Sequence, residues 1–388
     1  MRVGLVSVDP DRKWIGGRYY LQHLVRAVRS LPREDQIEMA DVWWQAASAD
    51  DPFAEVRGLL DDQVIVTPPH TLGGRLKRKL LRLTRGWRDA RDLFVSARID
   101  AVFPIEPCAD PGIPLIFWMP DFQPWRIPEL FAADLKAWFE QHYAENGAAA
   151  ERIVVSSEDG LRDLTTWFPQ FRAKARVLHF CSIPTAEWWE RDPADVALRY
   201  ALPEKFFLLA NQFSHHKNHR IVFEAVSLLR ARGVPVVVAC TGSTFGFRGN
   251  DYLEGLQRLL ADNNLGNAVR ILDLIPRADQ VALMRRSIAL LQPSRFEGWS
   301  TVVEDGKTLG KPIVVSDLPV HREQDPTGAI FAPVDDADAW AKAMETLWNR
   351  RGPGPHAEEE SAGARALEAA QRDTGETFVR IVREAVGG

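Results

Sequence analysis

The segment from Pro293 to Asp305 holds the side chains best suited to chemistry. An apolar run ends just before it, Gly298 provides a turn, and a helical pattern begins near Thr301. The carboxylate of Glu297 can accept hydrogen bonds from hydroxyl groups. The backbone N–H groups of Ser300 and Thr301, at the start of the helix, can face an anion. The segment therefore suits a ligand that carries both hydroxyls and phosphates.

Two further carboxylates, Glu304 and Asp305, lie about one turn into that helix. In one interpretation a carboxylate there binds a second polyol, so that carboxylates flank the anion site as a nucleotide sugar requires. In the other interpretation both residues are first-turn acids, whose charges complement the helix dipole.

A second polar loop runs from Asn211 to His219, between an apolar run and a helical pattern that continues to Leu229. Lys217 can meet a phosphate at the start of that helix, a charge-assisted contact worth roughly 1.5–3 kcal/mol. His215 and His219 have i,i+4 spacing, which is also compatible with a metal site. No flanking Glu or Cys completes such a site, so the phosphate interpretation is favoured.

Two more loops follow expected strands. Gly16 and Gly17 precede a helical pattern, and paired glycines let the backbone approach a ligand closely. Their spacing is not GxGxxG, so the dinucleotide-binding fingerprint is not met. Asp121 is followed by aromatic residues, which suits a sugar held by hydrogen bonds and ring stacking. The alternative is an Asx turn that starts the next helix.

Metal-binding patterns are weak. The triplets Asp9-Pro10-Asp11 and Asp336-Ala337-Asp338 have a spacing that can ligate Mg²⁺. The second precedes a helical pattern, so its acids are better explained as helix caps. We therefore predict no metal site. The sequence also contains no GxxxxGK[ST], HExxH or GxSxG motif, which argues against the common ATPases, zinc proteases and hydrolases.

Short apolar runs alternate with helical patterns along the whole chain. Continuous β-branched runs are typical of buried parallel strands. Such runs occur at 3–8, 101–104, 114–118 and 152–156 in the first half, and at 206–210, 234–239, 289–292 and 312–316 in the second. Repeated strand–helix units predict an α/β fold with a doubly wound parallel sheet, and the two series predict two such domains.

Domain boundaries follow from composition. Prolines and charges concentrate between Pro184 and Pro203, and a Gly- and Pro-rich, then acidic, stretch at 351–364 is predicted to be an exposed linker. We expect a first domain at 1–190, a second at 203–360, and a C-terminal helix at 365–388 that crosses back to the first.

Composition narrows the class of protein. The 388 residues are 46% hydrophobic and 26% charged, an ordinary globular composition, and the net charge of −5 argues against a nucleic-acid binder. Three cysteines at long spacings give no disulfide framework. No signal-peptide pattern is visible, and no apolar run approaches the ~20 residues that span a bilayer. We expect a cytoplasmic enzyme.

The segment from Arg75 to Asp92 carries eight Lys or Arg and two Asp, interleaved with leucines and a tryptophan. A basic amphipathic helix can lie on an anionic membrane surface, which would attach the protein peripherally through Arg75–Arg91. The simpler interpretation, which we favour, is a surface helix whose leucines face the core.

Together these segments resemble the retaining glycosyltransferases of family 4, which have the GT-B fold of two Rossmann-like domains facing across a cleft. The resemblance is most specific at PSRFEGWSTVVEDGKTLGKPIVVSD, which is similar to the E-x7-E segment of that family and the strand after it. LLANQFSHHKNH, WMPDFQPW, RIVVSSE and the N-terminal Gly-Gly loop support it, and they occur in the right order along most of the chain.

The resemblance implies roles for individual residues. Lys217 would hold the donor diphosphate, and Glu297 would contact hydroxyls of the transferred sugar. The family's second Glu, which binds the ribose hydroxyls, falls at Asp305, with Glu304 beside it. Asp121, in a family His-Asp pair that reads Pro120-Asp121 here, would contact the acceptor or the sugar. The other implied donor-binding residues are Gly16, Gly17, Asn211, Gln212, Gly298, Ser300 and Thr301.

One departure concerns charge. The family usually has an Arg five residues before the lysine, and this chain has Gln212 there. One cation fewer would face the diphosphate unless Arg18 or Arg295 compensates.

The implied reaction transfers a sugar from a nucleoside diphosphate to a glycan, lipid-linked or small-molecule acceptor. Anomeric configuration would be retained and no metal or cofactor used, and the pathway would build cell-envelope or exopolysaccharide. One alternative is another GT-B activity, an epimerase or a glycogen-type phosphorylase, although no pyridoxal-lysine motif is visible. The other is a degenerate module that binds a nucleotide sugar without transferring it, which Gln212 and Asp305 suggest. The residues do not distinguish UDP from GDP or ADP.

Overall fold

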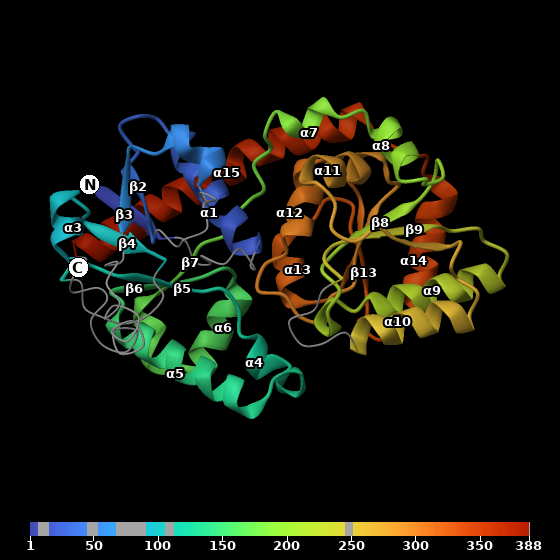
Figure 1. The fold of residues 1–388 in the computed structure, drawn as a ribbon, viewed down its shortest axis with the longest axis horizontal. Coiled ribbons are helices and arrows are strands. Elements are labelled where there is room, and N and C mark those ends of the chain that lie inside the picture. The colour runs from blue at the N-terminus through green and yellow to red at the C-terminus, as the bar shows by residue number, and fades with distance from the viewer. Residues whose placement is uncertain (7–14, 45–52, 67–90, 105–111, 245–250, 388) are drawn as a thin grey trace, which may run out of the picture. The chain divides into compact units, whose positions relative to one another are not determined.

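The computed structural model describes residues 1–6, 15–44, 53–66, 91–104, 112–244 and 251–387. Contacts divide the chain into two compact units (Figure 1), Met1–Cys181 with Ala369–Gly388, and Ser182–Glu368. Each unit is described by itself. The Asp9-Pro10-Asp11 triplet and residues 75–90 of the predicted basic segment lie outside the described residues.

Unit 1 is built on short parallel strands. They are β1 (Arg2–Val6), β2 (Glu38–Trp44), β3 (Asp62–Val66), β4 (Ala101–Phe103), β5 (Ile116–Met119), β6 (Arg152–Val155) and β7 (Ala175–Val177). They form two sheets, β3-β2-β1-β4 and β5-β6-β7, joined by an isolated parallel bridge between Val102 and Leu115. The chain winds outward from β1 in both directions, as in a doubly wound fold.

Helices cover the strands of unit 1. They are α1 (Ile15–Arg29), α3 (Arg91–Ser96), α4 (Gln123–Arg126), α5 (Ala133–Ala149) and α6 (Glu158–Trp167), with 3₁₀ turns η1 (Ala54–Leu59), η2 (Pro128–Leu130) and η3 (Pro169–Lys174). The later part of α15 (Ala357–Val386) completes this unit. Phe378 of α15 is buried there, with its ring centroid 5.2 Å from that of Phe103.

Unit 2 contains one parallel sheet in the order β10-β9-β8-β11-β12-β13. Its strands are β8 (Phe207–Ala210), β9 (Val238–Thr241), β10 (Val269–Ile271), β11 (Leu290–Gln292), β12 (Ile313–Ser316) and β13 (Ile330–Ala332). Its other elements are α7 (Glu187–Glu190), α8 (Pro193–Arg199), η4 (His215–Lys217), α9 (His219–Ala231), α10 (Asp251–Asp262), α11 (Arg277–Arg286), α12 (Thr301–Thr308), α13 (Pro319–Gln324) and α14 (Ala337–Arg350).

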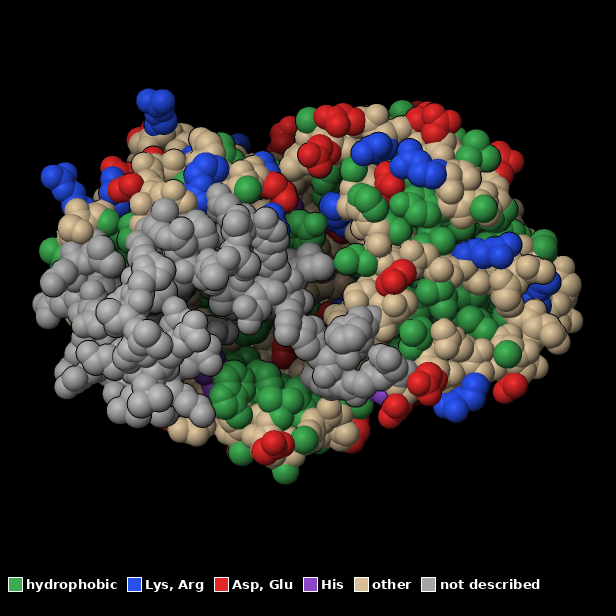
Figure 2. Space-filling model, in the orientation of Figure 1, with side chains coloured by type: hydrophobic (Ala, Val, Ile, Leu, Met, Phe, Trp, Pro, Cys, Tyr) green, Lys and Arg blue, Asp and Glu red, His purple; other side chains and the backbone are tan. Residues whose placement is uncertain are grey.

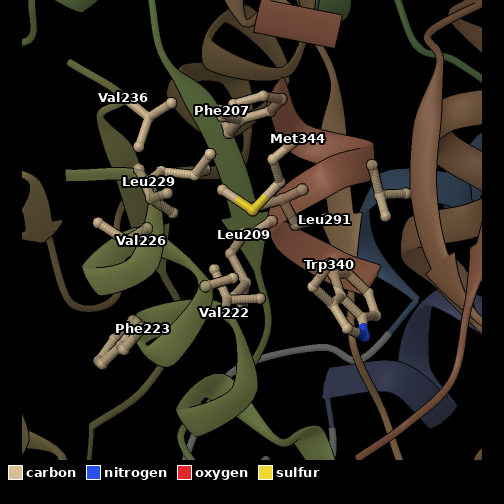
Figure 3. Close-up of a cluster of buried hydrophobic side chains, with 14 of the residues drawn as sticks. Phe207, Leu209, Val222, Phe223, Val226, Leu229, Val236, Leu291, Trp340 and Met344 are labelled. Atoms are coloured by element: carbon tan, nitrogen blue, oxygen red, sulfur yellow. The ribbon is translucent and has the colours of Figure 1, made fainter. Parts of the chain in front are cut away.

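The core of unit 2 lies on both faces of its sheet. On one face α9 and α14 pack on β8 and β11 (Figure 3), where Phe207, Leu209, Val226, Trp340 and Met344 meet in the close-up. On the other face α8, α11 and α12 bury a second apolar cluster. Two covered faces explain why the strands read as continuous apolar runs.

The structure confirms the α/β class with doubly wound parallel sheets, and it differs from the sequence predictions in detail. One strand runs over Val238–Thr241 instead of 234–239, because Pro235 cannot donate to a ladder and Val236 N–H turns back to the Val234 carbonyl, at 2.9 Å. The division between units falls at Cys181–Ser182, and α7 and α8 occupy the Pro- and charge-rich stretch between Pro184 and Pro203.

The predicted linker at 351–364 is helical from Ala357 onward, so α15 runs unbroken over the predicted break. Its first-turn acids complement the helix dipole, and two of them are paired. Glu359 accepts from Arg351 at 2.6 Å and Glu360 from Arg285 at 2.7 Å.

Charges of both signs are interspersed over the face of unit 2 in view, without a stripe of one sign among its described side chains (Figure 2). Among the described residues, no helix combines the length and apolar character needed to cross a membrane.

Candidate active site

Two loops of unit 2 lie at the point where the winding of its sheet reverses. Strands β8 and β11 are neighbours at the centre of the sheet. The chain proceeds from β8 toward one edge and from β11 toward the other, and ligands of open α/β sheets bind beyond the strand ends at such a point. The loops 211–218 and 293–300 follow these strands, and they are joined by a hydrogen bond from Arg295 N–H to the His216 carbonyl, at 2.7 Å.

Glu297 is the centre of the contact between these loops. Its Oε1 accepts three hydrogen bonds, from Lys217 Nζ at 2.6 Å, Ser294 Oγ at 2.6 Å and Gln292 Nε2 at 2.7 Å. The residue is only 9% exposed. Its other oxygen, Oε2, makes no such bond to any residue that the structure describes, so it is the oxygen left to accept from a ligand.

The charge of Glu297 is held by these partners. Burial raises the pKa of its carboxyl group, but the charges of Lys217 and His216 and the hydrogen bonds from Lys217 and Ser294 outweigh that effect. The resulting pKa lies below the usual value for Glu, so the side chain is ionised at neutral pH.

Gln292, the last residue of β11, fixes the orientation of Glu297. It is fully buried, and its Oε1 accepts from Asn211 Nδ2 at 2.8 Å while its Nε2 donates to Glu297. Two predicted site residues, Asn211 and Glu297, are therefore connected through one amide. The sequence analysis missed Gln292, and the signal that could have found it is a polar residue at the end of a fully apolar strand.

The two carboxylates on α12 have different partners. Glu304 accepts from Gln324 Nε2 at 2.9 Å and from Lys307 Nζ at 3.2 Å. Asp305 Oδ1 accepts from Arg277 Nη2 at 2.6 Å, and its Oδ2 is buried without a hydrogen-bond partner. Both residues are buried, and each faces a different neighbouring helix, α13 or α11.

At the start of α12, the hydroxyl and the backbone N–H of Ser300 already have hydrogen-bond partners within the protein. The Ser300 hydroxyl caps the helix by accepting from Val303 N–H at 3.4 Å. The Ser300 N–H donates to Gln324 Oε1 at 3.2 Å, so that predicted anion-facing amide already has a partner. Gly298 and Thr301 are half-buried in the same turn.

A third loop supports Asn211. Gly242, just after β9, has φ 136°, and a Cβ atom there would lie 2.3 Å from the Asn211 carbonyl oxygen. Its N–H donates to the Asp273 carbonyl at 3.0 Å. Only glycine fits this close approach without strain.

The cations proposed to replace the missing arginine have partners of their own. Gln212 is exposed. The Arg295 guanidinium pairs with Asp335 within unit 2, and that of Arg18 pairs with Glu55 within unit 1 at 3.3 Å.

The predicted site residues of unit 1 lie in α1 and just before α4. Gly16 and Gly17 lie in the first turn of α1, and the loop before it lies outside the described residues. Asp121 Oδ1 accepts from Gln123 N–H at 2.9 Å, so Asp121 forms the Asx turn that begins α4. Its carbonyl accepts from the Tyr143 hydroxyl at 2.8 Å.

Two histidines of the 211–219 loop differ in burial and in ring contacts. His215 is exposed and its ring lies 4.5 Å from that of Tyr252, whereas His219 is fully buried and stacks on Phe213 at 4.2 Å. Asp336 caps α14 by accepting from Ala339 N–H at 3.0 Å, as the cap interpretation predicts.

Comparisons with known proteins support a glycosyltransferase fold. Residues 192–366, which include every site residue of unit 2, match the family model described as "Glycosyl transferases group 1". The O-antigen chain mannosyltransferase RfbU of Salmonella typhimurium is 29% identical over 97 residues, or 25% of this chain. The alignment spans only 28% of the length of that relative.

Solved structures are similar over nearly the whole chain. HepE of Anabaena, in complex with UDP and glucose, has a TM-score of 0.66 at 14% identity, covering 99% of this chain and 97% of that one. A glycosyltransferase from Rickettsia africae has a TM-score of 0.64 at 12% identity, covering 99% and 98%. WaaG, a glycosyltransferase involved in lipopolysaccharide biosynthesis, has a TM-score of 0.61 at 12% identity, with the same coverage. The chain therefore has the GT-B fold and carries a glycosyl transferases group 1 domain in its second unit.

Proposed function

We propose that the protein is a retaining, metal-independent glycosyltransferase of the family 4 type, acting in cell-envelope or exopolysaccharide biosynthesis. The observation that carries the proposal is the partly buried pair of Lys217 and Glu297 at the reversal point of the unit 2 sheet, at 2.6 Å. It places a cation for phosphate and a carboxylate for sugar hydroxyls side by side. The donor is a nucleoside-diphosphate sugar, and UDP is supported by its presence in the complex of HepE.

The chemistry follows from these two groups. The bond between the anomeric carbon and the donor phosphate oxygen breaks, and a bond to the acceptor oxygen forms on the same face. The acceptor proton moves to the departing phosphate oxygen, so no protein base is required. Lys217 stabilises the negative charge that develops on the phosphate. Glu297 Oε2 accepts from a hydroxyl of the transferred sugar, and Asp305 binds the ribose.

The acceptor is a glycan or a lipid-linked sugar. A relative named as an O-antigen chain mannosyltransferase and a structural neighbour involved in lipopolysaccharide biosynthesis support this class. Asp121 is assigned to the acceptor side, together with Gly16 and Gly17. The protein would work in the cytoplasm. If it attaches to an anionic membrane surface, the basic segment at 75–91 is the contact.

The test measures donor binding and turnover by the full chain. Thermal unfolding is followed with UDP, GDP, ADP and their common sugars, with and without EDTA. A ligand at 100 times its Kd stabilises the folded state by roughly 2.7 kcal/mol, which a melting shift reports. We expect a shift with one nucleotide class that EDTA leaves unchanged and that Glu297→Gln weakens. The anomeric configuration of the product is then read by NMR.

Three results would count against the proposal. A shift abolished by EDTA would refute metal independence, and an inverted product would refute retention. Donor binding without turnover, even with membrane-derived acceptors, would favour a module that binds the nucleotide sugar without transferring it.

A further inference from the structure

The Lys and Arg side chains of the two loops at the reversal point are already balanced by carboxylates. Lys217 and Arg295 are the lysine and the arginine of the segments 211–218 and 293–300. Lys217 is paired with Glu297, and Arg295 with Asp335. A nucleotide sugar carries a negative charge on each phosphate of its diphosphate. Its binding adds negative charge to loops that are close to neutral, so a further cation there would favour it.

His216 is a half-buried histidine beside the Lys217–Glu297 pair. It directly precedes Lys217 in η4, and its carbonyl accepts from Arg295 N–H at 2.7 Å, which ties it to the loop that carries Glu297. A positive charge on its ring lowers the pKa of the Glu297 carboxyl, so the ring lies within electrostatic reach of that carboxylate. The ordinary pKa of a histidine side chain, about 6.5, lets a neighbouring anion change its charge near neutral pH.

The ring of His216 has a hydrogen-bond partner that suits both of its charge states. Its Nδ1 lies 3.2 Å from Ser214 Oγ. A hydroxyl can donate to the bare nitrogen of a neutral ring and accept from the N–H of a charged one. The contact with Ser214 therefore does not oppose a change of charge at His216.

Other titratable groups around this turn keep their charge state near neutral pH. His219, the first residue of α9, is fully buried, which lowers its pKa to about 3. Burial likewise lowers the pKa of His321 in α13. Tyr252 of α10, whose ring lies 4.5 Å from that of His215, has its pKa raised by burial to about 12. Proton uptake near neutral pH is therefore left to His216 and to the exposed His215.

We propose that His216 is the second cation of the donor site: its ring takes up a proton from the solvent when a nucleotide sugar binds, so that the diphosphate meets two positive charges. The inference rests on the proposed function, which supplies the diphosphate. An anion beside the ring favours the charged imidazole. Donor affinity is therefore highest at low pH, and it is lost as the pH rises above the range in which the bound ring holds its proton.

The test measures proton uptake by isothermal titration of the full chain with UDP-glucose, GDP-mannose and ADP-glucose. Their diphosphates do not titrate near neutral pH, so any uptake belongs to the protein. Titration in HEPES and in Tris, which differ in ionisation enthalpy, gives the number of protons bound. We expect about half a proton per donor near neutral pH, and a Kd that rises about fivefold to tenfold from pH 6 to pH 8. His216→Gln should take up no proton and keep a nearly constant Kd. His216→Lys, which is charged throughout, should bind more tightly than H216Q at pH 8, also without uptake.

His215→Gln is the matched control, because it removes the neighbouring, exposed histidine of the same turn. We expect H215Q to keep both the proton uptake and the pH dependence of the wild type. A wild type that binds a donor without proton uptake would overturn the inference, as would an uptake that H216Q keeps or that H215Q alone removes. H216K binding no more tightly than H216Q at pH 8 would also overturn it, because a charge at this position would then not matter. A wild type that binds none of the three donors would instead refute the proposed function.

Discussion

Lys217 Nζ donates to Glu297 Oε1 at 2.6 Å, so a cation from the loop after β8 and a carboxylate from the loop after β11 form one partly buried pair. The two loops are 80 residues apart in sequence and adjacent in the sheet. Before any donor arrives, each charge is already oriented by the other. If Lys217 binds the donor phosphate as proposed, its ammonium group is already held in place by Glu297 and needs little reorganisation during the reaction.

In the proposed reaction Lys217 stabilises the departing phosphate, so replacing it should remove that stabilisation. We expect Lys217→Met to lower kcat by about 10²–10³-fold, the usual effect of removing one preorganised electrostatic group. Single-turnover transfer with saturating donor is the measurement. Lys342→Met, which removes a surface cation paired with Asp338, is the control and should keep wild-type turnover. A kcat for K217M within about twofold of the control would exclude this role.

Gln292 should matter for both stability and turnover. Gln292→Leu removes one hydrogen bond to Glu297 and leaves the Asn211 amide unpaired in the core. We expect the free energy of unfolding to fall by about 1–3 kcal/mol, measured by urea titration, and kcat to fall more than donor affinity. Ser287→Ala, which removes a buried hydroxyl bonded to the Met284 carbonyl, should lower stability alone. Parallel behaviour of the two variants would show that Gln292 is only structural.

Gly242 should tolerate no side chain. Gly242→Ala combines a φ of 136° with a Cβ atom 2.3 Å from the Asn211 carbonyl oxygen, so the loop must move. Gly233→Ala is a matched control, because Gly233 has a φ of 79° and open space around its Cβ position. G233A should cost roughly 1–2 kcal/mol of stability from the backbone alone. G242A should cost more and weaken donor binding as well, and equal effects of the two variants would refute the steric argument.

His219 should make the protein sensitive to acid. Burial lowers its pKa from 6.5 to about 3, so the unfolded chain binds the proton more readily between these values. The contribution of neutral His219 to the free energy of unfolding is therefore fully present above pH 6.5 and is lost as the pH drops toward 3. We expect urea unfolding of His219→Phe, which keeps the stacking on Phe213, to show a smaller loss of stability over this range than the wild type. Equal pH dependence in both proteins would contradict the assignment.

The sequence predicted the elements better than the contacts between side chains. Apolar runs located β1, β4, β5, β6, β8, β11 and β12, because strands covered on both faces leave a continuous signal. Strand β2, which lies inside its sheet, was missed because acidic residues interrupt its apolar run. Edge strands such as β10 and β13 were missed, since each is three residues long and only partly buried. The helix pattern after Gly298 placed α12 correctly at Thr301.

In the candidate site, too, the sequence predicted the loop residues but not the side chains that contact them. Loop chemistry singled out Lys217 and Glu297, which the structure brings together. The partners that orient the acidic residues, Gln292 and Arg277, lie outside the predicted loops, and spacing along one chain gives no sign of them. A ligand-binding carboxylate and an Asx turn have the same local sequence, so the sequence could not show that Asp121 Oδ1 accepts from Gln123 N–H.

Because α15 contributes to both units, the residues of unit 2 are all translated before those of unit 1 are complete. The polypeptide of unit 2 is complete once Glu368 has been added, whereas unit 1 also needs residues 369–386 of that helix. Until they emerge from the ribosome, Phe103 lacks the Phe378 ring that covers it. The first unit to be translated is thus the last to be finished, and its unfinished apolar surface is what a nascent-chain chaperone would meet.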